Sequence, residues 1–167
     1  IHYFRVRNRD KDYGVALIYG YGGFGISITP FYISNIGPFI EDGGVYIVVN
    51  LRGGGEYGEK WHKAGVKENK INVFRDYISI SSHFKDKGYK IVGWGVSNGG
   101  LLISAVSTMK PDSLDIAIIG YPVIDMLRFH KLYIGYLWTT EYGDPDNASD
   151  RVYLSKYSPY HNIKNGV

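Results

Sequence analysis

The sequence predicts an α/β protein in which helices cover a mostly parallel sheet, and three observations lead to this prediction. Short β-branched and apolar runs such as VYIVVN (residues 45–50) are typical of buried strands. Two longer stretches, residues 71–87 and 98–110, are typical of helices. Strands and helices alternate along the chain, which is the pattern of βαβ units, whose strands are parallel and whose helices lie on the faces of the sheet.

Each expected strand is bounded by turn residues. The opening IHYFRVR alternates between the two faces of a strand, and the turn NRDKD follows it. The run GVALIY is short and apolar, as in a buried strand, and a long loop with Gly and Pro extends from about residue 20 to 44. Five strands are expected, at residues 1–7, 14–19, 45–50, 90–96 and 115–122.

Two helices are expected between the later strands. In residues 71–87 the apolar side chains fall on one helical face, and Gly88 is a suitable residue to end the helix. These side chains are Val73, Phe74, Tyr77, Ile80 and Phe84. The helix over 98–110 stops before Pro111, because Pro cannot continue a helix. After residue 122 the chain is rich in Tyr and irregular, with one short helix expected near 147–155.

The composition excludes several classes of protein. Of the 167 residues, 44% are hydrophobic and 21% are charged, so we expect one globular domain over residues 1–167. The net charge of +3 is scattered, which predicts no nucleic-acid or membrane surface, and no apolar run is long enough to span a bilayer. The chain has no Cys, which excludes a disulfide framework and a thiolate zinc site. The absence of Cys is compatible with a reducing compartment, and we expect a cytoplasmic location. We also expect no metal or cofactor.

The stretch GWGVSNGG contains the pattern Gly-x-Ser-x-Gly around Ser97, between a predicted strand and a predicted helix. In that context the Ser occupies a sharp, strained turn that lifts its hydroxyl above the carboxyl edge of the sheet. Gly95 and Gly99 suit the turn because larger side chains there would collide. The N–H of Asn98 begins the helix, where the helix dipole favours an oxyanion. The pattern predicts a nucleophile, and the alternative is an ordinary Ser in a Gly-rich turn.

Two Gly-rich segments offer other interpretations. GYGGFG (residues 20–25) matches the dinucleotide pattern Gly-x-Gly-x-x-Gly, but that pattern must open a helix, and the following ISITP is a poor helix start. A dinucleotide site also needs an acidic residue that binds the ribose at the end of the next strand, but here that strand ends at Asn50. RGGGE (residues 52–56) lacks the Lys-Ser/Thr of a phosphate-binding loop, so we expect a structural loop.

These segments together resemble the prolyl oligopeptidase family of serine peptidases. The matching stretches are YGYGGFGISITPFY, GGVYIVVNLRGGGEYGEKWHKAGVKENKINVF, GVSNGGLL, DMLRFHKLYIGYLWTTEYGDP and LSKYSPYHNIK, in the family's order and over nearly the whole chain. The resemblance implies a partial α/β-hydrolase fold that lacks the C-terminal strands and the β-propeller of the family. The chain has no initiator Met, which agrees with a piece of a longer protein.

The resemblance also implies roles for particular residues. Ser97 matches the nucleophile; the Asn98 N–H and the Tyr21 hydroxyl match the oxyanion donors; Phe24, Val123 and Tyr142 match the walls of the proline pocket; and the Trp138 indole matches the surface on which the proline ring stacks. Oxyanion donors suit an acyl-transfer intermediate, and a flat aromatic suits a stiff apolar ring. From the residues alone, an alternative interpretation is that Trp138, Val123 and Phe24 are core residues and that Tyr21 anchors its loop.

The general base and its acid are not found. A Ser nucleophile needs a His oriented by a carboxylate, and in this fold both follow the Ser in the chain. His130 and His161 are the histidines after Ser97, and both match positions that are not the base in the family. Asp125 follows the last predicted strand, where some proteins of this fold have their acid, and its alternative role is to anchor DMLRFH.

The sequence therefore predicts a fragment of a peptidase that cleaves short proline-containing peptides after proline and is inactive alone. One alternative is an esterase or aminopeptidase of the same fold. Another is a non-catalytic remnant, whose unpaired sheet edge would favour self-association.

Overall fold

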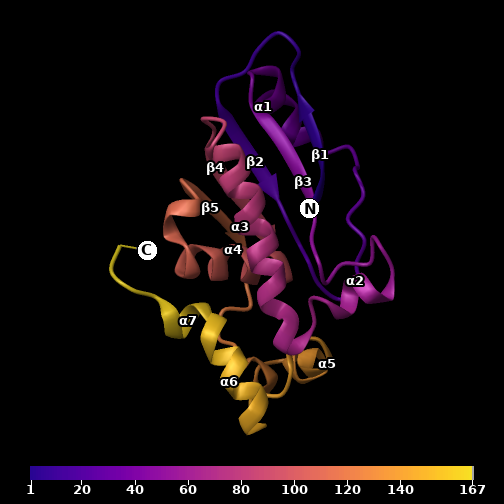
Figure 1. The fold of residues 1–167 in the computed structure, drawn as a ribbon, viewed down its shortest axis with the longest axis vertical. Coiled ribbons are helices and arrows are strands. Elements are labelled where there is room, and N and C mark those ends of the chain that lie inside the picture. Colours follow the sequence, from indigo (N-terminus) through magenta and orange to yellow (C-terminus); the bar gives the residue numbers. More distant parts are fainter. Residues whose placement is uncertain (167) are drawn as a thin grey trace.

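The computed structural model describes residues 1–166 and has one five-stranded sheet in the order β1-β3-β2-β4-β5 (Figure 1). β1 runs antiparallel to β3, and the other neighbouring strands are parallel. The strands are β1 (His2–Arg7), β2 (Val15–Tyr19), β3 (Val45–Asn50), β4 (Lys90–Val96) and β5 (Ile116–Gly120). The predicted α/β class, the mostly parallel sheet and the five predicted strands are confirmed.

Helices cover both faces of this sheet, unequally. On one face lie α3 (Ile71–Lys85) and α4 (Asn98–Met109) (Figure 1). They bury Phe74, Tyr77 and Leu101 against the strands. On the other face lies the short α1 (Gly37–Glu41) with the loop before it. Because strand side chains alternate, Ile18 belongs to the first layer and Leu17 to the second. The helical face predicted for residues 71–87 is buried throughout.

The C-terminus of α3 has the geometry expected for a helix that ends at a glycine, here Gly88. Gly88 has a φ of +87°, and the Tyr89 N–H donates to the Phe84 carbonyl at 3.1 Å. The Gly88 N–H donates to the Lys85 carbonyl at 2.8 Å. These two bonds make a Schellman motif, which requires a left-handed residue at Gly88. Gly88 therefore ends the helix, as predicted.

The shortest helices escaped prediction. They are α1, α2 (Glu59–Lys63), α5 (Thr139–Tyr142) and α7 (Pro159–Asn162), none longer than five residues. A helix of one turn cannot show a repeating apolar face, so its sequence lacks the signal on which prediction rests. The longer α6 (Ala148–Tyr157) agrees with the helix expected near 147–155.

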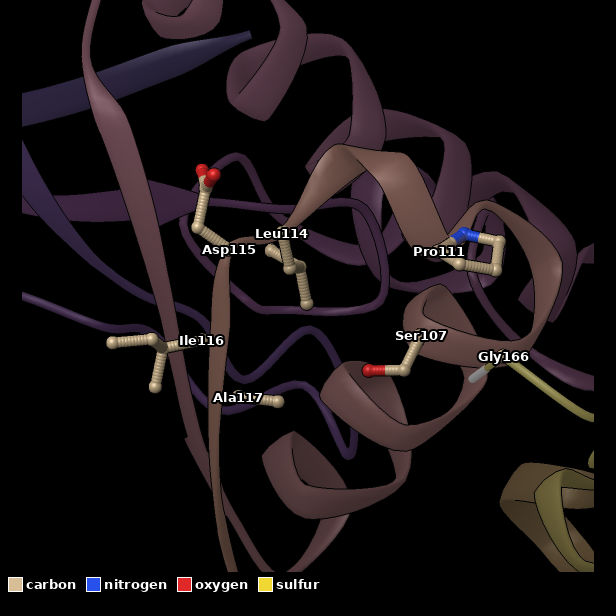
Figure 2. Close-up of a pocket in the computed structure, with 7 residues that line it drawn as sticks. All are labelled: Ser107, Pro111, Leu114, Asp115, Ile116, Ala117 and Gly166. Atoms are coloured by element: carbon tan, nitrogen blue, oxygen red, sulfur yellow. The ribbon is translucent and has the colours of Figure 1, made fainter.

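β5 is an edge strand whose side chains are exposed. Ile116, Ile118 and Ile119 expose 58%, 46% and 40% of their surface. Figure 2 shows Ile116 and Ala117 in a surface pocket that also receives Ser107 of α4. This pocket lies where β5 begins, whereas the Ser97 turn follows the end of β4. Because β4 and β5 are parallel, the pocket and the Ser97 turn lie at opposite ends of these strands. None of the helices in residues 1–166 is both long and apolar enough to cross a membrane.

Candidate active site

Ser97 occupies the sharp turn between β4 and α4. Its φ of +59° and ψ of −114° are rarely adopted by a residue with a side chain, and such strain occurs mostly at functional sites. A Cβ at Gly95 would collide with the Gly99 carbonyl, and a Cβ at Gly99 would lie 2.5 Å from the Gly20 carbonyl oxygen. The two glycines are therefore needed for the reason that the sequence indicated. Ser97 itself is exposed, and its N–H donates to the Gly120 carbonyl of β5 at 2.8 Å.

Asn98 has two roles, one of which the sequence did not predict. It begins α4, so its N–H is among the first four helical donors, which have no partner within the helix. Its side chain is buried and bridges two other segments. The Asn98 Nδ2 donates to the Tyr21 carbonyl at 2.6 Å, and the Tyr142 hydroxyl donates to the Asn98 Oδ1 at 2.9 Å. The side chain thus ties the Tyr21 loop and the Tyr142 helix to the start of α4.

The loop of residues 20–25 follows β2 and lies beside the Ser97 turn. Gly22, Phe24 and Gly25 have φ values of +63°, +56° and +62°, so the backbone turns tightly without forming a helix. Residues 26–33 contain no helix either, which is incompatible with a dinucleotide site. The Gly25 N–H donates to the Gly53 carbonyl at 3.1 Å, which joins this loop to the RGGGE segment.

RGGGE is a structural loop, in agreement with prediction. Arg52 forms an ion pair with Asp76 of α3, and its Nε donates to the Asp76 Oδ2 at 2.8 Å. This pairing raises the pKa of the Arg52 guanidinium. Glu56 accepts a hydrogen bond from the Ile28 N–H at 2.9 Å. Both charged ends of the segment are therefore used to hold neighbouring elements.

Six of the seven predicted site residues line one pocket. Its lining consists of Tyr21, Phe24, Ile26, Ser97, Val123, Trp138 and Tyr142. The seventh predicted residue, Asn98, lies behind the pocket and contacts Tyr21 and Tyr142 as described. Ile26 was not predicted, although its place two residues after Phe24 in the same loop is a signal for it. The pocket joins the exposed Ser97 hydroxyl to a mainly aromatic wall.

The aromatic wall is anchored by Tyr142. The Phe24 and Tyr142 rings meet edge to face, with centroids 5.5 Å apart and planes at 86°. Tyr142 is 1% exposed, and burial raises the pKa of its phenol well above the ordinary value. Tyr142 therefore remains protonated and donates to Asn98, while its ring contributes to the wall. Trp138, from the short helix Gly135–Trp138, is half-buried and completes the wall.

Tyr21 lies beside the candidate nucleophile with its hydroxyl protonated. Burial chiefly, with the charges of Tyr19 and Glu141, raises the pKa of the Tyr21 phenol. The nearby Ser97 side chain opposes this rise. At neutral pH the phenol keeps its proton, so Tyr21 can donate to an oxygen that gains negative charge near Ser97.

The histidines weighed as bases are engaged elsewhere. The His161 Nδ1 lies 2.9 Å from the Ser158 Oγ, and the His130 Nε2 lies 3.1 Å from an Asp146 carboxylate oxygen. Asp125 accepts from the Leu127 N–H at 3.2 Å and from Arg128 at 2.6 Å, so it anchors its own turn. Within residues 1–166 no hydrogen bond joins the Ser97 Oγ to a histidine.

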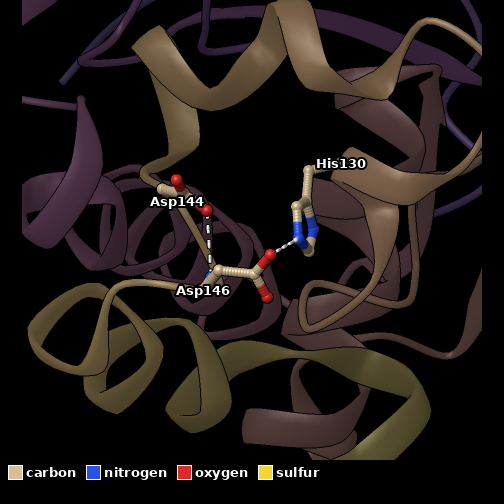
Figure 3. Close-up of side chains that lie close together, drawn as sticks. All are labelled: His130, Asp144 and Asp146. Carbon is tan, nitrogen blue, oxygen red and sulfur yellow. Dashed lines mark hydrogen bonds and ion pairs between the residues drawn. The ribbon is translucent and has the colours of Figure 1, made fainter.

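Figure 3 shows His130 turned toward Asp146, with Asp144 beside them. One ligand atom from each of the three lies within 4.8 Å of the others, so their donor types would suit a cation. However, the Lys131 Nζ donates to Asp146 at 2.9 Å. The hydrogen bond from Lys131, and then the proximity of His130, hold the pKa of Asp146 below its ordinary value. Lys131 thus already neutralises this carboxylate, and the group is an ion-pair cluster.

A second ionic cluster, not predicted from the sequence, lies behind the pocket. Glu141 is 3% exposed and Lys70 is 1% exposed, and the Lys70 Nζ lies 3.1 Å from the Glu141 Oε1. The His62 Nε2 lies 2.9 Å from the Glu141 Oε2. We call His62, Lys70 and Glu141 the Glu141 cluster. Its only sequence signal is that Glu141 precedes Tyr142.

The strained Ser97 turn between a parallel strand and a helix, with donors beside it, is typical of the α/β-hydrolase fold. Comparison with known proteins gives the family. The model of the prolyl oligopeptidase family matches residues 30–167. The chain is 44% identical over 157 residues to a prolyl endopeptidase of Elizabethkingia miricola, covering 91% of this chain and 22% of that protein. It is 44% identical over 149 residues to a prolyl endopeptidase of Dictyostelium discoideum, covering 86% and 20%.

Solved structures agree with this comparison. A structure from a study of two prolyl endopeptidases superposes with a TM-score of 0.94 at 38% identity, covering 99% of this chain and 25% of that one. Prolyl oligopeptidase B of Galerina marginata, bound to a 25mer macrocyclization substrate, gives a TM-score of 0.91 at 36% identity, covering 98% and 24%. The chain belongs to the prolyl oligopeptidase family. It spans about a fifth to a quarter of the length of these relatives.

Proposed function

We propose that the chain is part of a serine peptidase that hydrolyses short peptides on the carboxyl side of proline through an acyl-enzyme on Ser97. One observation carries this proposal: the exposed Ser97 hydroxyl and the aromatic wall of Phe24, Trp138 and Tyr142 share one pocket. A flat aromatic surface suits the stiff apolar ring of proline. Membership of the family, whose relatives include prolyl endopeptidases, supports the same reaction.

In this reaction the Ser97 Oγ attacks the carbonyl carbon that follows the proline ring, and the Ser proton passes to a general base. The carbonyl oxygen gains negative charge and accepts hydrogen bonds from the Asn98 N–H and the Tyr21 hydroxyl. The C–N bond then breaks, the amine leaves with the proton, and an ester on Ser97 remains. Water hydrolyses that ester and restores the hydroxyl.

We further propose that the base and its carboxylate partner come from outside residues 1–167, so that the chain alone is inactive. The contacts of His130 with Asp146 and of His161 with Ser158 support this proposal, because each places a ring nitrogen against another residue. We also propose that the open β5 edge favours self-association of the chain. The cytoplasmic location remains a prediction from composition.

An esterase or aminopeptidase of the same fold is the second candidate, and a non-catalytic remnant is the third. The Trp138 wall favours the first candidate over the second, because cleavage of an ester or of an amino-terminal residue does not require a surface for proline. An activity test separates the first two candidates from the third.

The test treats the purified chain with a fluorophosphonate probe, which reacts only with an activated Ser. Ser97→Ala is the control for the site. Ser107→Ala, on α4 and outside the Ser97 pocket, is the control for labelling of other Ser hydroxyls. We expect no labelling of the folded chain alone and labelling at Ser97 when the remaining part of the enzyme is supplied. Labelling of the chain alone would refute the external base. Absence of labelling in the complete enzyme would refute Ser97 as the nucleophile.

A further inference from the structure

The Glu141 cluster contacts the loop that carries the candidate oxyanion donor Tyr21. The Glu141 Oε1 accepts from the Phe24 N–H at 2.9 Å. The Lys70 Nζ donates to the Gly22 carbonyl at 3.0 Å. The cluster therefore holds both an N–H and a carbonyl of this short loop, one on either side of Gly23.

The loop has little room to move under these contacts. A Cβ on Gly23 would lie 2.5 Å from the Asn98 Nδ2 and 2.9 Å from the Lys70 Nζ, so both side chains press against its backbone. Phe24 has a φ of +56°, which is unfavourable for a residue with a Cβ and persists only where the surroundings determine it. The hydrogen bond from the Phe24 N–H to Glu141 holds this residue, together with the edge-to-face contact of its ring with Tyr142.

Stability alone does not explain two buried charges here. Taking an ammonium and a carboxylate out of water costs about as much as their attraction returns, and apolar residues of similar volume are often as stabilising. Burial lowers the pKa of the Lys70 ammonium, whereas the Glu141 carboxylate opposes that shift. What apolar residues cannot supply is a donor for the Gly22 carbonyl and an acceptor for the Phe24 N–H.

We propose that Lys70 and Glu141 are positioning residues, which set the place of the Tyr21 hydroxyl relative to Ser97 by holding the loop at Gly22 and Phe24. The inference rests on the proposed function of Tyr21 as an oxyanion donor. Glu141 also adjoins Tyr142 in α5, so the same pair fixes the loop against the aromatic wall. The Lys70 Nζ lies 5.2 Å from the centre of the Tyr142 ring, which adds to this connection.

The first experiment measures amide hydrogen exchange by NMR in the full chain and in the double variant Lys70→Met/Glu141→Leu. We expect a lower thermal stability, because the Gly22 carbonyl and the Phe24 N–H lose their partners, and exchange of the Phe24 amide at least about tenfold faster. The Gly20 amide, which donates to Trp94 at 3.2 Å, serves as an internal reference and stays unchanged. Asp146→Asn, which opens the other ionic cluster, is the matched control and leaves the Phe24 amide unchanged.

Glu141→Gln is the milder variant, should the double variant fail to fold. It keeps an acceptor for the Phe24 N–H but leaves Lys70 without its counter-ion, so we expect the Gly22 contact to rearrange and the Tyr21 amide to exchange faster. Unchanged exchange throughout residues 21–24 in either folded variant would overturn the inference. This readout requires no turnover, so it decides the inference even if the proposed function fails.

Kinetics on the complete enzyme give the second readout. Glu141→Gln should lower kcat by about tenfold to a hundredfold, the range of a small misplacement of reacting groups, with KM within about threefold. In a Tyr21→Phe background the same substitution should cost little, because it acts through the Tyr21 hydroxyl. Equal losses in both backgrounds would show a purely structural role and overturn the inference.

Discussion

Removal of a single oxygen from Tyr142 tests whether the site is tied together as described. The Tyr142 hydroxyl donates to the Asn98 Oδ1 at 2.9 Å, and both residues are 1% exposed. In Tyr142→Phe the Asn98 oxygen therefore has no partner and no access to water. An unsatisfied buried acceptor costs about 1–3 kcal/mol, so we expect a loss of about 2 kcal/mol of unfolding free energy. For a domain of this length the loss corresponds to a fall in Tm of about 4–8 °C.

The assay is thermal and urea unfolding followed by circular dichroism. Tyr77→Phe is a matched control, because the buried Tyr77 hydroxyl donates to the Ile18 carbonyl at 2.7 Å, away from the pocket. Both variants should be destabilised by similar amounts, but only Tyr142→Phe should slow the reaction of Ser97 with the probe in the complete enzyme. Destabilisation of Tyr142→Phe by less than about 0.5 kcal/mol would refute the hydrogen-bonded link from Tyr142 through Asn98 to the Tyr21 loop.

Three further outcomes are expected. Trp138→Ala should weaken binding of a peptide ending in proline by about tenfold in calorimetry, with no change for one ending in alanine; equal losses would contradict proline stacking. The Ile91 N–H is the chief cause of the lowered pKa of Asp115, so this carboxylate stabilises the fold above its unfolded pKa, and the contribution is lost as pH falls through the lowered folded pKa. Acid titration of Asp115→Asn should therefore show a shallower loss of stability, and a curve equal to that of the wild type would exclude a contribution from this carboxylate. Ile118→Lys on β5 should shift any oligomer toward monomer in size-exclusion chromatography, and an unshifted oligomer would place the contact elsewhere.

The parts of the structure that were predicted have local causes. A strand such as residues 45–50 is buried on both faces, so its apolar run reports its place directly. The Ser97 turn is local at Gly95, where a Cβ would collide with Gly99, whereas the need for Gly99 comes from the Gly20 carbonyl of a distant segment. The pocket is not local, because it joins residues 21, 97, 123 and 138, and only the family resemblance brought these together before the structure did.

The Glu141 cluster was missed for a physical reason. Lys70 lies in KENK, a stretch that looks like a solvated surface, and nothing within it distinguishes a buried ammonium from an exposed one. Its burial follows from the approach of Gly22 and Glu141, which are distant in sequence. The side-chain role of Asn98 was missed likewise, since both its partners belong to other segments.

The attachment of Ser97 to the edge of the sheet has a consequence for its motion. β5 pairs with β4 on one side only among the described residues, whereas β2 and β3 are paired on both sides. β1 and β5 are the two edge strands, and local opening of the sheet is expected at such strands, which have fewer bonds to break than the central ones. The Ser97 N–H donates to Gly120, the last residue of β5, so each fraying of that strand removes one restraint from the strained turn. Any partner that covers β5 would restrain the candidate nucleophile from a distance, without contacting the pocket.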